Sequence, residues 1–206
     1  MKVMLINGSP HQYGCTYTAL KEAADALNLR GVETEILWIG QKPVAGCIAC
    51  SHCKENGLCV FDDLVNYIIS KLPETDGFIF GSPVYYAGPS GQLQSLMDRL
   101  FHGSGSKFAG KVASAVVSCR RGGASAAFQR LNLYFQMNNM IVITSQYWNQ
   151  VHGHTPEQVR QDAEGMQTMR TLAENMAYVL KSLEAGKNAG VPPLSYEPKE
   201  FTNFIR

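Results

Sequence analysis

Residues 2–18, KVMLINGSPHQYGCTYT, run from an apolar segment through a glycine-bearing loop straight into a helical pattern. The segment 2–7 is apolar nearly throughout rather than alternating, which is typical of a parallel strand covered by helices on both faces. The same succession of strand and helix recurs along the chain. Further strands are predicted at 34–39, 77–82, 111–118 and 140–145, and helices at 16–30, 63–72, 89–101, 124–137 and 157–184.

This alternation predicts a doubly wound α/β fold, with helices on both faces of a five-stranded parallel sheet. Right-handed crossovers leave several strand orders open, and five strands favour the flavodoxin-like order 2-1-3-4-5. In such a sheet, ligands bind at the carboxyl ends of the strands. The residues that follow each strand are therefore the ones to examine for function.

Composition limits the classes of protein that need to be considered. The chain has 206 residues, of which 45% are hydrophobic and 17% charged, and its net charge is +1. These values fit one folded domain, predicted at residues 1–186, and we expect neither nucleic-acid nor membrane binding. The chain begins directly with a strand, which favours a cytoplasmic protein. The Pro-rich residues 187–206 also carry aromatic side chains, so we expect this tail to pack on the domain or on a partner subunit.

The loop after the first strand could bind an anion. Gly8 and Gly14 allow a tight backbone, Ser9, Thr16 and Thr18 supply hydroxyls, and a helix begins where the loop ends. Backbone N–H groups at a helix start, with hydroxyls beside them, suit a phosphate. The alternative is an ordinary strand-to-helix turn, and the loop lacks the Lys-Ser/Thr of a nucleotide-hydrolysing P-loop.

Two later loops could face a flat ligand at the same edge. Residues 83–88, PVYYAG, place two tyrosines between proline and glycine, and residues 119–123, CRRGG, form a polar, glycine-rich segment. Aromatic rings and exposed backbone groups suit a planar ring, although the tyrosines could instead be half-buried surface residues. The three loops together predict a nucleotide-like cofactor, and FMN is the one usually found on this topology.

Three segments resemble the NADPH-dependent FMN reductase family: GSPxxxGxT at 8–16, GSPVYYAGPSGQLQSLMDR at 81–99 and RRGGA at 120–124. The resemblance covers residues 2 to about 184 and implies FMN as cofactor with NAD(P)H as electron donor. It assigns FMN contacts to Ser9, His11, Gly14, Cys15, Thr16, Pro83, Val84, Tyr85, Tyr86, Gly88, Arg120, Gly122 and Gly123. His11 and Gln12 stand where the family often has Arg and Lys, and Cys15 where Asn is common. The phosphate charge would then be met more by backbone and hydroxyl dipoles than by a guanidinium.

Residues 46–60 form a cysteine-rich loop with thiols at Cys47, Cys50, Cys53 and Cys59. Zinc sites usually join two separated pairs of ligands, whereas this C-x2-C-x2-C run is closer to that of ferredoxins. The spacing also resembles the branch that includes the iron–sulfur flavoproteins, which implies a [4Fe–4S] cluster. Metal-free thiols and a four-thiolate zinc site are the alternatives. Because the loop follows the second strand, we expect it at the same sheet edge as the flavin loops.

These observations predict an FMN-dependent oxidoreductase that takes hydride from NAD(P)H and passes electrons to a flavin, a quinone or an iron–sulfur centre. Catalysis would be centred on the flavin, without an obligatory side-chain acid or base. A flavodoxin-type electron carrier without NAD(P)H oxidase activity and a cysteine-based metal or redox sensor are the alternative functions. We expect a homodimer or homotetramer, since Phe101, Tyr134, Tyr147 and Trp148 exceed the aromatic surface that a small monomer must expose.

Overall fold

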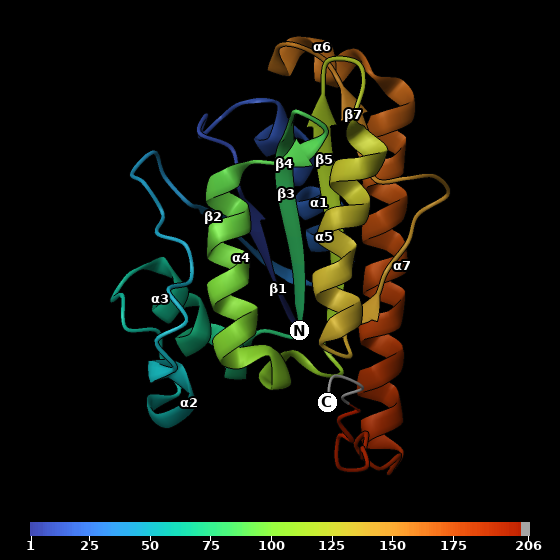
Figure 1. Cartoon of the computed structure of the whole chain (residues 1–206). Helices are drawn as coiled ribbons and strands as arrows, with labels where there is room; N and C mark the ends of the chain where they lie inside the picture. The colour runs from blue at the N-terminus through green and yellow to red at the C-terminus, as the bar shows by residue number, and fades with distance from the viewer. Residues whose placement is uncertain (203–206) are drawn as a thin grey trace.

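The sheet has the predicted flavodoxin-like topology. The structure is a computed structural model and describes residues 1–202. Parallel strands lie in the order β2-β1-β3-β5-β6, which corresponds to the predicted order 2-1-3-4-5 (Figure 1). Their bounds are β1 (Lys2–Asn7), β2 (Glu33–Trp38), β3 (Gly77–Tyr85), β5 (Val112–Cys119) and β6 (Ile141–Val142). The prediction of a doubly wound parallel sheet is confirmed.

The fifth strand is interrupted, which the sequence did not reveal. β6 pairs with the start of β5, and a separate strand, β7 (Gln150–His152), pairs in parallel with its end. Residues 143–149 leave the sheet between them. Asn149 supports this detour, because its buried side-chain Nδ2 donates to Ser114 Oγ at 2.8 Å and its side-chain Oδ1 accepts from Ser145 Oγ at 2.7 Å. The prediction of one continuous strand at 140–145 was therefore wrong in extent.

Helices cover both faces of the sheet because successive strand residues point to opposite sides. Val3 and Leu5 face α1 (Cys15–Leu29) and α7 (Ala163–Asn188), whereas Met4 and Ile6 face α3 (Leu64–Lys71), α4 (Gly91–Ser104) and α5 (Ala124–Met137). Each face of the sheet therefore carries its own core of buried apolar side chains, and Figure 1 shows helices on both sides of the sheet. The shorter elements are α2 (His52–Asn56), α6 (Pro156–Gln161), the antiparallel β4 (Gly88–Pro89) and 3-10 turns at Leu72–Glu74 and Gly105–Phe108.

The predicted last helix, 157–184, is divided at Asp162. This residue ends α6 and caps α7, since its carboxylate accepts hydrogen bonds from Gly165 N at 3.0 Å and His152 N at 2.6 Å. An aspartate that satisfies first-turn amides favours a new helix start over continuation of the preceding helix. The break also fixes β7 against α7.

The C-terminal tail begins later than the sequence pattern predicts. α7 continues to Asn188, and residues 191–202 are exposed and without regular structure. A Cβ placed on Gly110 would lie 3.3 Å from Leu194 Cδ1, so the tail passes close to the domain there. The remainder of the predicted tail, residues 203–206, lies outside the described residues. In the described part of the chain, the helices are too short or too polar to cross a membrane.

Candidate functional site

The loop after β1 approaches β3 closely at Gly8. Gly8 N donates to Gly81 O at 2.8 Å, and a Cβ on Gly8 would lie 2.8 Å from that oxygen and 2.7 Å from Leu93 Cδ2. Ser90, the N-cap residue of α4, donates its hydroxyl to Gly8 O at 2.6 Å. The first loop is therefore fixed to β3 and to the start of α4, and only glycine leaves room for this contact.

The helix that follows this loop has an N-terminus suited to an anion. α1 begins at Cys15, and its N-cap residue is Gly14. Glycine has no side chain, so it does not cap the backbone amides of the first turn. The first turn carries no acidic residue, and the helix is 15 residues long. Because the first amides of a helix have no intrahelical acceptor and lie at the positive end of the dipole, they can bind a phosphate.

The hydroxyls predicted to bind phosphate instead shape the loop. Ser9 is buried, and its Oγ accepts from His11 N at 3.1 Å. Thr16 is also buried and hydrogen-bonds through Oγ1 to Ser118 Oγ at 2.8 Å. Thr18 donates its hydroxyl to Gly14 O at 3.1 Å. The structure thus places the predicted residues at the carboxyl edge of the sheet. The main candidate donors to a phosphate there are backbone amides rather than these hydroxyls.

Trp38 is a part of this site that the sequence reasoning missed. Its indole Nε1 donates to Ser9 O at 2.8 Å and so holds the loop from the end of β2. Trp38, His11, Gly14, Cys15 and His154 belong to the lining of an open hollow beside the start of α1. Its position in the sequence could have indicated this role, since Trp38 ends a strand at the carboxyl edge where ligands bind.

The loop after β3 is a hairpin rather than an irregular segment. β3 extends through Pro83 and Val84 to Tyr85, which pairs with Gly88 in β4. Tyr86 and Ala87 at its tip have φ values of 49° and 60°, a pair of left-handed residues that makes a type I′ turn. Left-handed non-glycine residues are costly and cluster at functional sites. The Tyr86 side chain is fully exposed and Tyr85 about half exposed, so both rings are accessible to a ligand.

The loop after β5 packs against this hairpin. Gly123 has φ +90° and begins α5, and a Cβ there would lie 2.9 Å from Ala87 Cα and 3.2 Å from Val84 Cγ1. Arg120 and Gly122 are exposed beside it. The structure therefore brings the three predicted flavin loops to one edge and links them through Ser90–Gly8 and Gly123–Ala87 contacts.

Two thiols lie at the same edge. Burial raises the pKa of Cys15 and of Cys119, so both thiols stay protonated at neutral pH. Cys119 Sγ lies 3.4 Å from His152 Nδ1, and Cys15 Sγ lies 3.8 Å from Gly153 O. Neutral thiols are poor nucleophiles, which agrees with chemistry centred on a flavin rather than on cysteine.

The cysteine-rich loop lies elsewhere than expected. From the end of β2 the chain runs down the outer side of α4 to α2, away from the hairpin tip (Figure 1). A Cβ on Gly103, near the end of α4, would lie 3.0 Å from Cys53 Cβ. The expectation that the loop shares an edge with the flavin loops was wrong, because its contacts are with the C-terminal half of α4 rather than with the strand ends.

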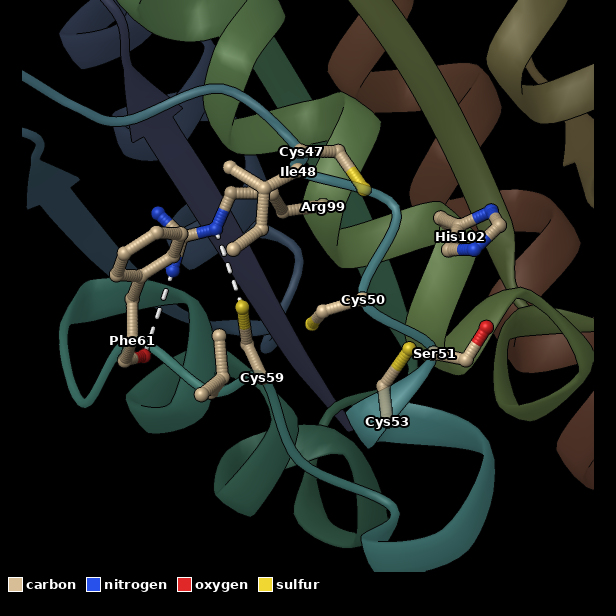
Figure 2. A pocket seen from close by; sticks show the side chains of 10 residues that line it. Cys47, Ile48, Cys50, Ser51, Cys53, Cys59, Phe61, Arg99 and His102 are labelled. Atoms are coloured by element: carbon tan, nitrogen blue, oxygen red, sulfur yellow. Dashed lines mark hydrogen bonds between the residues drawn. The ribbon is translucent and has the colours of Figure 1, made fainter.

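The four cysteines of this loop line one small cavity. Cys47, Cys50, Cys53 and Cys59 surround it together with Arg99 and His102 (Figure 2). All four cysteines are free thiols. Within residues 1–202, the His, Cys, Asp and Glu side chains do not converge in threes on a point where a single metal ion could bind. Four cysteines on one cavity are the donor set that a [4Fe–4S] cluster uses, since such a cluster is larger than one ion and is bound by four thiolates.

Comparison with known proteins identifies the family of the chain. Residues 1–155 match the family described as NADPH-dependent FMN reductase. The chain belongs to this family. Among its relatives is an iron–sulfur flavoprotein of Methanocaldococcus jannaschii, 37% identical over an alignment of 192 residues; the match covers 89% of this chain and 100% of the relative. An iron–sulfur flavoprotein of Methanosarcina thermophila is 30% identical over an alignment of 192 residues; the match covers 91% of this chain and 100% of the relative.

Solved structures agree on the fold of this NADPH-dependent FMN reductase family member. A flavodoxin from the domain Archaea superposes with a TM-score of 0.60 at 15% identity, covering 88% of this chain and 99% of the flavodoxin. The resemblance read from the 8–16, 81–99 and 120–124 segments is thereby confirmed at the level of family and fold. The chain is a flavodoxin-like member of an FMN-binding oxidoreductase family.

Proposed function

We propose that this protein is an FMN-dependent oxidoreductase that accepts hydride from NAD(P)H and passes electrons to a small acceptor, such as a flavin or quinone, or to an iron–sulfur centre. The observation that carries the proposal is the joining of three cofactor-type loops at the carboxyl edge of a parallel sheet. The family membership supports FMN as the cofactor and NADPH as a donor of the right class.

Two parts of this edge suit the two ends of FMN. The phosphate would bind at residues 9–16, where the first-turn amides of α1 provide donors and no acidic residue of that turn opposes the charge. The ring would lie against Pro83–Gly88 and Arg120–Gly123. When bound, FMN supplies the redox chemistry, accepting a hydride and releasing electrons.

The chain's own residues position and enclose the ring. The hairpin holds Tyr85 and Tyr86 outward on a tight turn, so their rings can contact a planar cofactor without rearrangement of the sheet. Arg120 is exposed at the same edge and can meet the negative charge of the reduced ring or of the nucleotide donor. His11 borders the phosphate end in place of the cation common in the family.

Cys47, Cys50, Cys53 and Cys59 would hold a [4Fe–4S] cluster, because all four residues line the cavity shown in Figure 2. Such a cluster would act as a store or outlet for single electrons. Free thiols, four of them in one loop, suit a reducing cytoplasmic setting.

We also propose a homodimer or homotetramer. Phe101, one of the aromatic residues that prompted this expectation, is buried in the core, so it does not contribute to such a surface. Leu133 and Met137 instead expose apolar side chains along an open groove between α4 and α5. Light scattering on the purified holoprotein would give a mass of two or four chains, and a monomer at all concentrations would contradict this part of the proposal.

Anaerobic stopped-flow spectroscopy tests the proposed activity. FMN-loaded protein is mixed with NADPH or NADH, and bleaching of the flavin absorbance is followed before and after a quinone is added. Reduction by a nicotinamide within seconds and reoxidation by the quinone are expected. A flavin that dithionite reduces but neither nicotinamide does would show a flavodoxin-type carrier instead.

A further inference from the structure

Arg99 is a buried cation at the centre of the cysteine-rich loop's contacts with α4. It is only 2% exposed, although arginine is rarely buried without partners. Its Nε lies 3.2 Å from Cys59 Sγ and donates to it. Of the four thiols proposed as cluster ligands, Cys59 is thus the one that receives a charged donor, as Figure 2 shows.

The same guanidinium joins the two limbs of the loop. On the upstream limb, Arg99 Nη1 donates to Ala45 O at 3.3 Å. On the downstream limb, Arg99 Nη2 donates to Phe61 O at 3.4 Å, and both terminal nitrogens bind the Asp63 carboxylate at 2.7 and 2.8 Å. The Phe61 ring covers the guanidinium at 4.9 Å. One side chain therefore closes the loop on both sides of the four cysteines.

This geometry exceeds what a lysine could supply. The planar fork of arginine offers five donors in fixed directions, whereas an ammonium is a point charge with three donors. Lysine could keep the ion pair with Asp63, but it could not at the same time reach Ala45, Phe61 and Cys59. The arrangement thus depends on the shape of the guanidinium and not only on its charge.

We propose that Arg99 is a positioning residue for the iron–sulfur centre: it holds Cys59 in the fourth ligand position, closes the loop around the cavity, and raises the reduction potential of the cluster through its N–H donor to the Cys59 sulfur. The inference rests on the proposed cluster. Hydrogen bonds to cluster sulfurs set cluster potentials, and a donor stabilises the more negative, reduced state.

The first test uses metal-free protein and so does not depend on the cluster. Hydrogen–deuterium exchange of peptides covering residues 44–63 is compared between wild type, Arg99→Lys and the control Arg160→Lys, which changes an exposed arginine on α6. Exchange in this loop should be about tenfold faster in Arg99→Lys than in the other two proteins, with the sheet unchanged. Equal exchange in all three proteins would overturn the positioning role.

The second test measures the cluster. After anaerobic reconstitution, iron content and the cluster midpoint potential are determined by a spectroelectrochemical titration, with bound FMN as the internal reference. At the wild-type midpoint, the ratio of reduced to oxidised cluster should fall about tenfold in Arg99→Lys, or about 59 mV for a one-electron couple. Failure of this variant alone to retain iron would support the positioning of Cys59. A full cluster at the wild-type potential would overturn the proposal.

These outcomes separate the inference from the proposed function. If wild-type protein takes up no cluster but loop exchange responds to Arg99→Lys, the cluster assignment fails while the closing contact stands. If Arg99→Gln and Arg99→Lys shift the potential equally, the donor geometry decides the effect rather than the charge, as proposed. A shift in Arg99→Gln with none in Arg99→Lys would show a simple charge effect and contradict the donor role.

Discussion

The flavin loops and the cysteine-rich loop are built in different ways, although each follows a strand of the same sheet. The loops at residues 8–14, 83–88 and 119–123 end strands of one sheet, and backbone contacts at Gly8 and Gly123 join them. The cysteine-rich loop leaves the sheet after β2 and is closed by side chains, Arg99 above all. One site follows from the fold itself, whereas the other depends on a few side chains attached to it.

This difference predicts that the two sites can be lost separately. A site formed by strand ends and helix N-termini persists as long as the sheet folds, since its donors are backbone groups. A site formed by four thiols on a loop outside the sheet can be lost without affecting the core. The predictions below test this separation, beginning with the largest expected effect.

Replacing Cys47, Cys50, Cys53 and Cys59 together by serine should abolish iron binding completely and leave FMN affinity within about twofold of wild type. The reason is that these cysteines line the cavity they share with Arg99 and His102 of α4, and do not lie in the three flavin loops. Iron analysis and a fluorescence titration with FMN measure the two effects. Loss of FMN binding in this variant would show that the FMN site depends on the cysteine-rich loop.

The opposite variant is Gly8→Ala. Its methyl group would lie within 3.0 Å of Gly81 O and of Leu93, in a place where backbone cannot yield easily. Crowding of this kind costs about 1–3 kcal/mol, so FMN affinity should fall about tenfold to a hundredfold. Calorimetric titration with FMN provides the measurement.

Gly46→Ala is the matched control for Gly8→Ala, because a Cβ added to Gly46 would meet open space. It should bind FMN as wild type does. If both alanine variants bound FMN normally, the close approach of the first loop to β3 would not matter for the cofactor.

The two regions also differ in how well their structure can be predicted from the sequence. The strands and loops of the flavin edge were predictable because apolar runs and glycine positions report directly on a parallel sheet. The location of the cysteine-rich loop was not, since it depends on a buried arginine 40 residues beyond Cys59 in sequence. Such a contact joins residues that no local pattern relates.

Local chemistry also hid smaller features. The break of the last helix depends on Asp162 capping α7, and the interruption of the fifth strand depends on Asn149 reaching Ser114. Both are polar side chains that satisfy backbone or buried groups across elements. Periodicity of apolar residues carries no information about them.

Replacing Tyr85 and Tyr86 together by alanine should weaken FMN binding about tenfold, because contact between an aromatic ring and a flat ligand contributes about 1–2 kcal/mol. The rate of flavin reduction by NADPH should fall as well. Tyr178→Ala on α7, which also removes an exposed tyrosine, is the control. Unchanged affinity and rate in the double variant would remove the hairpin from the site.

The smallest effect concerns pH. Burial raises the pKa of Cys119 in the folded protein, so above about pH 8.5 the unfolded chain loses this proton first and is favoured. The free energy of unfolding should therefore fall between about pH 7 and about pH 9.5, and fall less in Cys119→Ala by up to about 1 kcal/mol. Urea denaturation at the two pH values measures the difference. An equal loss in both proteins would show that Cys119 titrates normally.

The most direct test of the separation is an FMN footprint on the intact protein. Hydrogen–deuterium exchange is measured with and without saturating FMN, on protein with one flavin bound per chain. Protection is expected in peptides covering residues 8–16, 83–88 and 119–123, with residues 46–60 unchanged. Absence of FMN binding, or protection centred on the cysteine-rich loop, would contradict the assignment of the flavin to the carboxyl edge of the sheet.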